Sequence, residues 1–291
     1  MCIFHYVKNG DAMRIHCWGS RGSFPVSGAE FVRYGGDTSC VEVESDKGDV
    51  VILDAGTGIR AFGDRFAETA PKKAAHLVCT HAHIDHIMGF PFFSPIFKEH
   101  TALNVYGCPC AADSLETAIR KLMRTPYFPV DFSALPSEIV FHEVTAAPFK
   151  IGTLTLTPIR LNHPNGGCGY RIEERGKVFV FITDNELEYG KPGFDAEYFE
   201  THCADADLLV HDAEYTDEDY KLYESWGHSK YTDAVKLALA AKAKRLGLFH
   251  INTRRTDDQM DAIVDDAKNI IARSGADLEC FGLGTGFEIT I

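Results

Sequence analysis

The sequence predicts a fold of mixed helices and strands, α/β (α+β), in which two β-sheets pack together and helices cover their outer faces. Short runs rich in Val, Ile and Leu, bounded by Gly, Ser or Asp, occur in both halves of the chain and are typical of strands. Amphipathic helical segments follow each cluster of strands. The 291 residues are 45% hydrophobic, enough for one large core or two small ones. We expect one domain over 13–291, because no linker interrupts that range, and an N-terminal extension at 1–12.

The expected strands fall into two groups along the chain. They cover 13–20, 39–45, 49–56 and 75–80, then 153–161, 169–174, 177–184, 206–212 and 247–252, before a short closing pair. The Gly-rich turn at 53–60 predicts a connection from strand to helix rather than a phosphate cradle, because it lacks the rest of either phosphate-loop fingerprint. Three prolines in 125–138 predict a loop.

Three helices are marked by their ends. Asp113 is a suitable N-cap for a helix over 113–124, because a Glu follows three residues later. A second helix is expected over 232–246, with Lys and Arg in its last turns and a glycine after its end. The capping-box pattern at 256–259 opens the last helix, which is expected to end near Arg273.

The composition limits the classes of partner. Lys and Arg number 29 and Asp and Glu number 42, so the formal net charge is −13. Stable binding of nucleic acid, which needs a cationic surface, is therefore not expected. A small anionic substrate is compatible with this charge, since bound metal ions reverse the local field. Neither a stretch long enough to cross a membrane nor a signal peptide is recognisable, so we expect a cytoplasmic protein.

Nine cysteines are scattered along the chain, and their odd number does not indicate a disulfide framework. We expect them to be reduced. Cys79 lies in an apolar run and is expected to be a small buried side chain. Cys108 and Cys110 lack the spacing of a zinc knuckle or a redox motif, which makes them a weak candidate for a pair of metal ligands.

The segment most informative about chemistry is HAHIDH, at 81–86, directly after the expected strand at 75–80. Because side chains alternate along an extended chain, His81 and His83 can point the same way, while Asp85 and His86 turn in from the start of the next element. Imidazole and carboxylate groups suit zinc, manganese or iron. Four such side chains within six positions predict a metal site.

HxHxDH after an apolar strand resembles the signature of the metallo-β-lactamase superfamily, and the resemblance extends from Met13 to the C-terminus. It implies a four-layer αββα sandwich with two divalent ions at one edge, zinc or alternatively manganese. It also implies further ligands in LNHPNGGCGYRI, FVFITDNE and LGLFHIN, which offer His163, Asp184 and His250. By this likeness Asp184 bridges two ions, one held by His81, His83 and His163 and the other by Asp85, His86 and His250.

Two further segments resemble the branch that contains cyclic phosphodiesterases and tRNA 3′-processing endonucleases. VHDAEY and WGHSK offer Asp212 and His228, an acid and a histidine that such enzymes pair. A carboxylate stabilises the protonated imidazole, which can contact a phosphoryl oxygen or protonate a leaving alkoxide. The alternative is a structural pair that stabilises a loop. A bridging acid at Asp184 fits phosphodiesterases and glyoxalase II-like thioesterases, while His83, in place of the acid of the di-iron oxidoreductases, favours hydrolysis.

The resemblance implies a mechanism in which hydroxide shared by two metal ions attacks phosphorus and His228, oriented by Asp212, protonates the leaving group. Asp85 would act at the same centre as a ligand. The net charge and the lack of a Gly- and Pro-rich basic arm favour a small cyclic phosphodiester, a cyclic nucleotide or a ribosyl cyclic phosphate, over tRNA. The alternatives are a glyoxalase II-like thioesterase or lactonase, a tRNA 3′-processing endonuclease, and a non-catalytic nucleotide sensor. Family members commonly dimerise, so we expect a homodimer.

Some residues are expected to stand outside this chemistry or at its margin. No ligand role is expected for the histidines that match no family segment, which are His5, His16, His76, His100, His142 and His202. Asn252 follows His250 by two positions, where some relatives carry Asp, so the pattern departs beside the second ion. Arg21 and Ser23 are candidates for lining the site, or equally are ordinary loop residues. The aromatic residues of 90–97 and 125–138 are expected in the core or at a dimer contact, with stacking on a base as the alternative.

Overall fold

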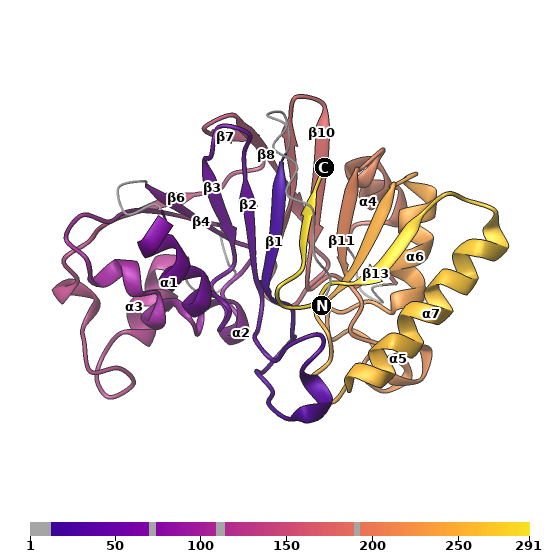
Figure 1. The fold of residues 1–291 in the computed structure, drawn as a ribbon, viewed down its shortest axis with the longest axis horizontal. Coiled ribbons are helices and arrows are strands. Elements are labelled where there is room, and N and C mark those ends of the chain that lie inside the picture. The colour runs from indigo at the N-terminus through magenta and orange to yellow at the C-terminus, as the bar shows by residue number, and fades with distance from the viewer. Residues whose placement is uncertain (1–12, 70–73, 109–113, 189–192) are drawn as a thin grey trace.

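The computed structural model describes residues 13–69, 74–108, 114–188 and 193–291. Their strands form two seven-stranded sheets, and helices lie on both outer faces of the pair (Figure 1). This is the four-layer αββα arrangement that the sequence predicted. Within the described residues, no helix is both long enough and apolar enough to span a bilayer.

The first sheet comes mainly from the N-terminal half. In spatial order its strands are β14 (Glu288–Thr290), β1 (Arg14–Gly19), β2 (Cys40–Glu44), β3 (Val50–Leu53), β4 (Ala75–Cys79), β5 (Ala102–Gly107) and β6 (Glu138–Glu143). The strands from β3 to β6 run parallel to one another, whereas β14, β1, β2 and β3 alternate in direction. All of β3 and nearly all of β4 are buried, because both faces of these strands are covered.

The second sheet repeats this design with the C-terminal half. Its order is β13 (Glu279–Gly282), β12 (Arg245–Phe249), β11 (Leu208–Asp212), β10 (Lys177–Ile182), β9 (Cys168–Glu174), β8 (Leu154–Arg160) and β7 (Phe149–Ile151). The strands from β10 to β13 are parallel, and β7 to β10 are antiparallel. Each sheet therefore has a parallel half whose carboxyl ends share one edge.

Helices flank the two sheets. Figure 1 shows α1 (Ile59–Thr69) and α3 (Leu115–Leu122) beside the first sheet, and α4 (Ala196–Cys203), α6 (Tyr231–Ala240) and α7 (Asp257–Ser274) beside the second. The short helices α2 (Ile84–Ile87) and α5 (Asp217–Tyr223) lie at the lower end of the sandwich in the same view. Four 3-10 turns, η1 (Ala29–Phe31), η2 (Phe90–Phe92), η3 (Ser94–Phe97) and η4 (Phe132–Ala134), complete the described elements.

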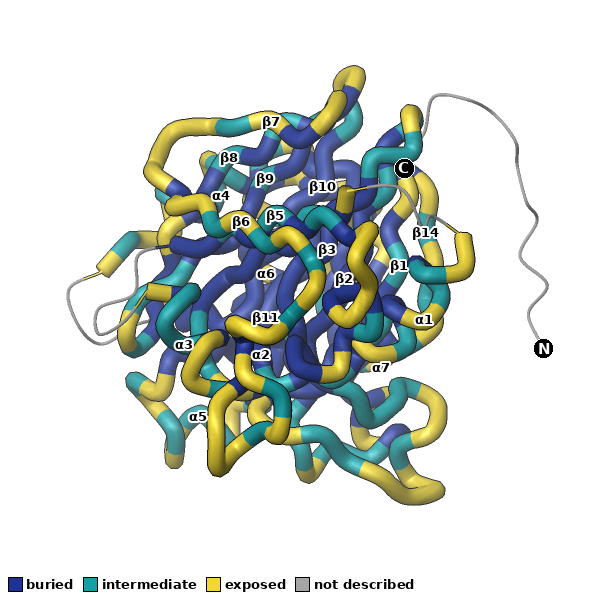
Figure 2. Tube along the Cα trace, turned by 90° about the vertical axis from the view of Figure 1, so that its left-hand side faces the viewer, coloured by how far each residue is buried: buried dark blue, intermediate teal, exposed yellow. Residues whose placement is uncertain are grey.

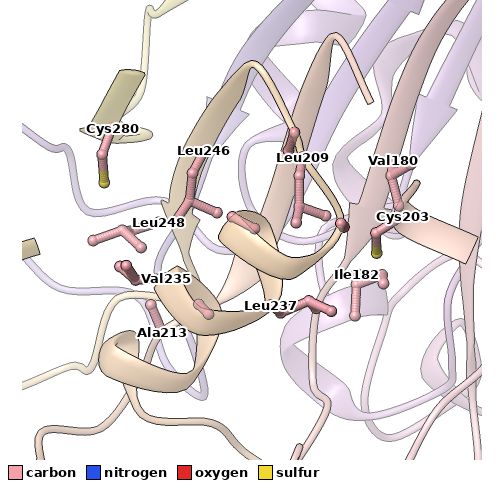
Figure 3. Close-up of a cluster of buried hydrophobic side chains, with 14 of the residues drawn as sticks. Val180, Ile182, Cys203, Leu209, Ala213, Val235, Leu237, Leu246, Leu248 and Cys280 are labelled. Atoms are coloured by element: carbon pink, nitrogen blue, oxygen red, sulfur yellow. The ribbon is translucent and has the colours of Figure 1, made fainter. Parts of the chain in front are cut away.

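Apolar side chains fill the space between the sheets and the space under each helical layer. Leu53 of the first sheet and Phe179 of the second belong to the cluster between the sheets. Figure 3 shows the cluster under α6, where Val235 and Leu237 pack with Leu209 and other residues of the second sheet. Each large apolar side chain buried in this way stabilises the fold by about 1.5–3 kcal/mol. Figure 2 accordingly shows the strands buried at the centre and the connecting loops exposed.

Several predicted elements are confirmed, but three strands were not foreseen. The turn at 53–60 connects β3 to α1 as predicted, and α7 begins after the Thr256 capping box and ends at Ser274, one residue beyond the expected end. The strands β5, β6 and β7 were missed. β5 contains Asn104 and ends at Gly107, both unfavourable in strands, and β6 lies largely exposed at the sheet edge.

The helix expected over 232–246 is wrong in its second half. The helix α6 ends at Ala240, and the backbone of Lys242 adopts a left-handed φ of 54°. Arg245 and the residues after it form β12, which pairs with β11 on one side and β13 on the other. The hydrogen bonds and burial of a central strand therefore override the helical propensity of this Ala- and Lys-rich segment.

The start of α3 also differs from the prediction. The N-cap is Ser114, whose hydroxyl accepts the N–H of Thr117, and the helix spans Leu115–Leu122 rather than 113–124. Asp113, the predicted cap, lies outside the described residues. Ser and Asp cap helices by the same side-chain oxygen, so the motif alone did not select between neighbouring positions.

The cysteines are not all reduced. Cys108, after β5, and Cys168, at the start of β9, form a disulfide bond with their Cα atoms 6.2 Å apart. The two residues are 60 positions apart, and only the packing of the two sheets brings them together. Cys79 is free and buried as predicted, and so are the other free cysteines of the described residues, Cys17, Cys40, Cys203 and Cys280. Cys110 lies outside the described residues.

Candidate metal centre

The site lies where five strands end. One site residue lies at or near the end of each strand: Asp54 for β3, His81 for β4, Asp184 for β10, Asp212 for β11 and His250 for β12. Parallel strands end at a common edge, which gathers Asp184, Asp212 and His250 within the second sheet. Oδ2 of Asp184 lies 3.6 Å from Nε2 of His81, so the corresponding edges of the two sheets meet.

Three of these residues have an unusual backbone. The φ angles of Asp54, Asp184 and His250 are 63°, 50° and 57°, in the left-handed region. Non-glycine residues rarely adopt this conformation, which costs on the order of 1 kcal/mol or more and persists where surrounding contacts hold it. All three are buried. Their concentration where strands of both sheets end points to a functional site at this edge.

The seven predicted ligands lie in adjoining groups. His81, His83, His163 and Asp184 offer ligand atoms that lie within 4.8 Å of one another, and so do Asp85, His86 and His250. His83 occupies the position before α2, and Asp85 and His86 lie within that helix. HAHIDH therefore supplies two histidines to the first group from the segment before α2, and one Asp and one His to the second group from α2 itself.

Asp184 lies between the two groups. Its Oδ2 faces His81 at 3.6 Å and His163 at 3.7 Å, counting to the Nε2 atom of each ring. Its Oδ1 faces Nε2 of His86 at 3.1 Å and Nε2 of His250 at 3.2 Å. One carboxylate therefore presents one oxygen to each group, an arrangement that suits a bridging ligand.

The buried polar atoms of this cluster fit divalent metal ions. Among the described residues, Nε2 of His81, His86 and His250 is buried without a hydrogen-bond partner in each case. Buried polar groups rarely lack partners, and imidazole nitrogens beside carboxylates are typical ligands of zinc and related ions. The two groups are consistent with a dinuclear metal site, and the donor set suits zinc or manganese without selecting between them.

Protonation divides the histidines into two kinds. Burial holds the pKa of His81 well below its usual value and lowers the pKa of His163 to about 4. Burial acts in the same direction on His86 and His250, but neighbouring carboxylates, Asp184 first among them, outweigh it and raise the pKa of both. A divalent cation competes with protons for these nitrogens, so metal binding is expected to release protons.

Partners on the far side of the rings fix their orientation. Nδ1 of His86 lies 2.7 Å from Oδ2 of Asp54, which was not recognised in the sequence. Nδ1 of His163 lies 2.9 Å from the carbonyl oxygen of Gly227, and Nδ1 of His81 lies 3.1 Å from Oγ1 of Thr80. In each ring this contact leaves Nε2 directed at the centre, where it is available to a metal ion.

The predicted pair of Asp212 and His228 also forms. Nδ1 of His228 lies 2.7 Å from Oδ2 of Asp212, and the ring centroid of His228 is 4.7 Å from that of His250. Burial alone lowers the pKa of His228, but the carboxylates of Asp212 and Glu214 outweigh it and raise the pKa to about 9. The pair therefore places a protonated imidazole beside the metal ligands.

The residues considered as candidates for lining the site have different roles. Arg21 is fully buried and donates to the carbonyl oxygens of Gly35, Asn252 and Arg255, so it holds loops together and does not line the site. The backbone N–H of Ser23 donates to Oδ2 of Asp85 at 2.8 Å. The aromatic segments divide between the core and the surface. Phe93 is fully buried, whereas Phe92 and Tyr127 are 58% and 78% exposed.

The histidines for which no ligand role was expected belong to none of these groups within the described residues. His16 pairs with Glu288, His142 contacts Asn104 and His202 contacts the carbonyl oxygen of Tyr198. His5 lies outside the described residues.

Sequence reasoning missed three carboxylates that support the site. Asp54 contacts His86, Glu214 contacts His250, and Glu186 accepts the backbone N–H groups of Ser225 and Gly227 just before His228. The sequence did carry a signal. Asp54 follows β3, Glu186 follows β10 and Glu214 follows β11, and each of these strands either leads to a predicted site residue or lies next to a strand that does. Acidic residues are so common at strand ends that the signal does not single these out.

The sequence and the fold of this chain both match known proteins. Residues 50–251 match the family described as "Beta-lactamase superfamily domain". Ribonuclease Z of Streptococcus pneumoniae (strain CGSP14) is 28% identical over 275 residues, covering 76% of this chain and 85% of that protein. The metallo-beta-lactamase fold protein YhfI from Bacillus subtilis has a TM-score of 0.71 at 21% identity, over 97% of this chain and 100% of that one. A diphosphatase from the PhnP family has a TM-score of 0.64 at 18% identity, over 95% and 97% of the two chains.

Proposed function

The chain belongs to the β-lactamase superfamily and is a hydrolase with a His/Asp metal site, and we propose that it is a dinuclear phosphodiesterase acting on a small cyclic phosphodiester. The observation that carries this proposal is the Asp212–His228 pair beside the two ligand groups. A hydrolase of thioesters or lactones needs the metal ligands but has no evident use for a buried proton donor at this place.

Two divalent ions would be held by His81, His83 and His163 on one side and Asp85, His86 and His250 on the other, with Asp184 between them. When bound, such ions lower the pKa of a water molecule and offset the negative charge of the phosphoryl group. In the hydrolysis a water oxygen forms a bond to phosphorus, the P–O bond to the leaving oxygen breaks, and the water gives up a proton to solvent.

The residues of the chain supply the remaining proton. Because Nδ1 of His228 is engaged by Asp212, its Nε2 is left to face the substrate. From there His228 protonates the leaving oxygen, which would otherwise depart as a high-energy alkoxide. Asp212 keeps the ring in one orientation and stabilises its protonated form, and it is fully buried.

The net charge of the whole chain supports a small substrate, although the acids nearest to Asp212 in sequence do not. The first turn of α5, which follows Asp212 by a few residues, carries Asp217, Glu218 and Asp219. Each of these acids is already paired with a cation, Asp217 with Lys230, Glu218 with Lys221 and Asp219 with Arg255. What disfavours a long polyanion is the net charge of −13, whereas a single phosphodiester that reaches two metal ions would be attracted locally.

A second candidate is an endoribonuclease acting on RNA 3′ ends. Two observations favour it, the likeness to ribonuclease Z over 85% of that protein and a surface cavity of about 580 Å³ near α3. Its lining carries three cations and one acid, and consists of Thr117, Arg120, Lys121, Arg124, Thr125, Asp131 and Phe132. A basic cavity away from the acidic α5 is a place where an RNA backbone can be held.

The deciding experiment is turnover by protein loaded with zinc or with manganese, with the metal content measured. The substrates are 2′,3′- and 3′,5′-cyclic nucleotides, ribosyl cyclic phosphates and a precursor tRNA, and bis(p-nitrophenyl) phosphate serves as a general phosphodiester. Asp184→Ala and His228→Ala are tested beside Glu218→Gln, an exposed control on α5. Turnover of a cyclic phosphate that both site variants lose and the control retains is expected.

Other outcomes separate the alternatives. Cleavage of the precursor tRNA without turnover of any cyclic phosphate would replace the proposal by the second candidate. A metal-loaded protein that hydrolyses no phosphodiester would overturn both, and thioesters and lactones would then be tested. For those substrates His228→Ala should retain full activity.

A further inference from the structure

Glu214 is a buried carboxylate next to the proposed metal centre, and the proposed function assigns it neither metal binding nor proton transfer. It follows Asp212 by two positions, just after the end of β11. Its Oε2 lies 2.7 Å from Nδ1 of His250 and 3.6 Å from Nδ1 of His228. Its Oε1 accepts a hydrogen bond of 2.9 Å from Nδ2 of Asn252. One side chain therefore touches a candidate metal ligand and lies beside the candidate proton donor.

Asn252 explains how this carboxylate is held. Oδ1 of Asn252 accepts the backbone N–H of Arg254, and its carbonyl oxygen accepts from the buried Arg21. These contacts fix the amide so that Nδ2 points at Glu214. A carboxylate at position 252 would face Glu214 with like charge and could not donate. The unexpected Asn after His250 is thus the matching partner of Glu214.

The two ligand groups differ in the kind of atom that contacts Nδ1 of their histidines. In the group of Asp85, both histidines are backed by carboxylates, His86 by Asp54 and His250 by Glu214. In the other group, His81 is backed by a hydroxyl oxygen and His163 by a backbone carbonyl oxygen. A carboxylate behind an imidazole raises its basicity and its affinity for a metal ion more than a neutral acceptor does.

We propose that Glu214 is a positioning residue that orients His250 and makes the Asp85–His86–His250 position the tighter of the two metal positions. The inference rests on the proposed dinuclear site but not on the identity of the substrate. The same carboxylate oxygen lies 3.6 Å from Nδ1 of His228, so it stands beside both the metal ligand and the proton donor.

The test measures zinc binding to metal-free protein by competition with a chromophoric chelator. Wild type is expected to bind two equivalents with distinct affinities. Glu214→Gln is expected to weaken the tighter equivalent by about 10- to 100-fold and leave the weaker one unchanged. Asp54→Asn alters the carboxylate behind His86 and also the one that holds Thr80, whose hydroxyl contacts His81, so it should weaken both equivalents. Glu218→Gln removes a charge from the exposed surface and should bind as wild type does.

A milder substitution controls for the case in which Glu214→Gln weakens zinc binding only because the protein folds poorly. Asn252→Ala leaves the carboxylate in place but removes its hydrogen-bond donor, and should weaken the tighter equivalent by about two- to fivefold. Circular dichroism and urea unfolding of the metal-free variants establish that each is folded. Unchanged affinities in both Glu214→Gln and Asn252→Ala would overturn the proposal, as would equal weakening of both equivalents.

The assay separates this inference from the proposed function. Binding is read without substrate, so a protein that hydrolyses no phosphodiester can still show the predicted asymmetry. In an active enzyme, Glu214→Gln should lower kcat at limiting zinc, and excess zinc should restore much of the loss. A role confined to stability would instead lower the unfolding midpoint of the metal-free protein without changing the ratio of the two affinities.

Discussion

The N–H of Gly227 donates a 2.8 Å hydrogen bond to Oε2 of Glu186, and the carbonyl oxygen of Gly227 lies 2.9 Å from Nδ1 of His163. One glycine thus connects the carboxylate two residues after Asp184 with a candidate ligand from another loop. It also precedes His228 directly. The geometry of both proposed activities, metal binding and proton donation, therefore depends on a single backbone position.

Gly227→Ala is expected to disturb this connection. Gly227 has a φ of 92°, and a Cβ atom there would lie 2.2 Å from Nδ1 of His163. We expect a loss of about 1–3 kcal/mol in the free energy of unfolding, with reduced zinc content in the folded protein. The control is Gly176→Ala, which has a φ of 79° but no atoms within 4 Å of its Cβ position. Equal zinc content in the two variants would contradict the role of His163.

The proton-donor role of His228 predicts a dependence on the leaving group. p-Nitrophenolate leaves readily without protonation, whereas a ribose alkoxide does not. His228→Ala should therefore lower turnover of a cyclic nucleotide by about 10²–10⁴-fold and turnover of bis(p-nitrophenyl) phosphate much less. Asp212→Asn should show the same selectivity in weaker form. Similar losses on both substrates would assign His228 to substrate binding instead.

Removal of metal is expected to destabilise the protein. Without bound cations, Asp85 and Asp184 remain buried beside each other and beside three histidines whose Nε2 atoms lack hydrogen-bond partners. An ion that binds only the folded state raises the unfolding temperature with its concentration. Chelation should lower the unfolding temperature in calorimetry, and added zinc should restore it. Asp184→Asn should retain the fold but lose most of this response, and a full response would argue against bridging.

The pair of Asp207 and Lys244 predicts a pH dependence of stability far from the metal groups. Burial alone raises the pKa of Asp207, but hydrogen bonds from Lys244 and the Val178 N–H outweigh it and hold the pKa below its usual value. A carboxylate with a lowered folded pKa stabilises the fold above its unfolded pKa, about 3.9, and loses this contribution as pH falls toward the folded value.

The measurement compares urea unfolding of metal-free wild type and Asp207→Asn between about pH 6 and about pH 3. The difference in free energy should be largest near neutral pH and shrink on acidification. Asp205→Asn, at a neighbouring exposed position, serves as the matched control. A difference that stays constant with pH would show that Asp207 acts through packing or neutral hydrogen bonds.

The local parts of the site could be predicted from the sequence. HAHIDH places four ligand-type residues within six positions, and a strand followed by one helical turn is enough to direct them inward. His163, Asp184 and His250 stand after apolar runs, and the family resemblance selected them from many similar positions. The alternation and burial of the strands are likewise short-range properties. Such features depend on neighbouring residues, which is why a sequence pattern identifies them.

The outer partners could not be predicted in the same way. Asp54 and His86 are 32 positions apart, Glu214 and His250 are 36 apart, and Glu186 and Gly227 are 41 apart. The first two pairs form where neighbouring parallel strands end at a common edge, and the third joins the segment after β10 to the loop between α5 and α6. The chain between the partners carries no trace of these pairings. The disulfide between Cys108 and Cys168 depends on the packing of the two sheets in the same way.

The sequence by itself thus determined most of the strands, the family and the residues able to bind metal, since these follow from short-range pattern and side-chain chemistry. The tertiary structure alone decided which oxygen of Asp184 faces which group, which acid backs each histidine, and where α6 gives way to β12. Those outcomes depend on contacts between distant segments of the chain, and these contacts form only when the two sheets pack together.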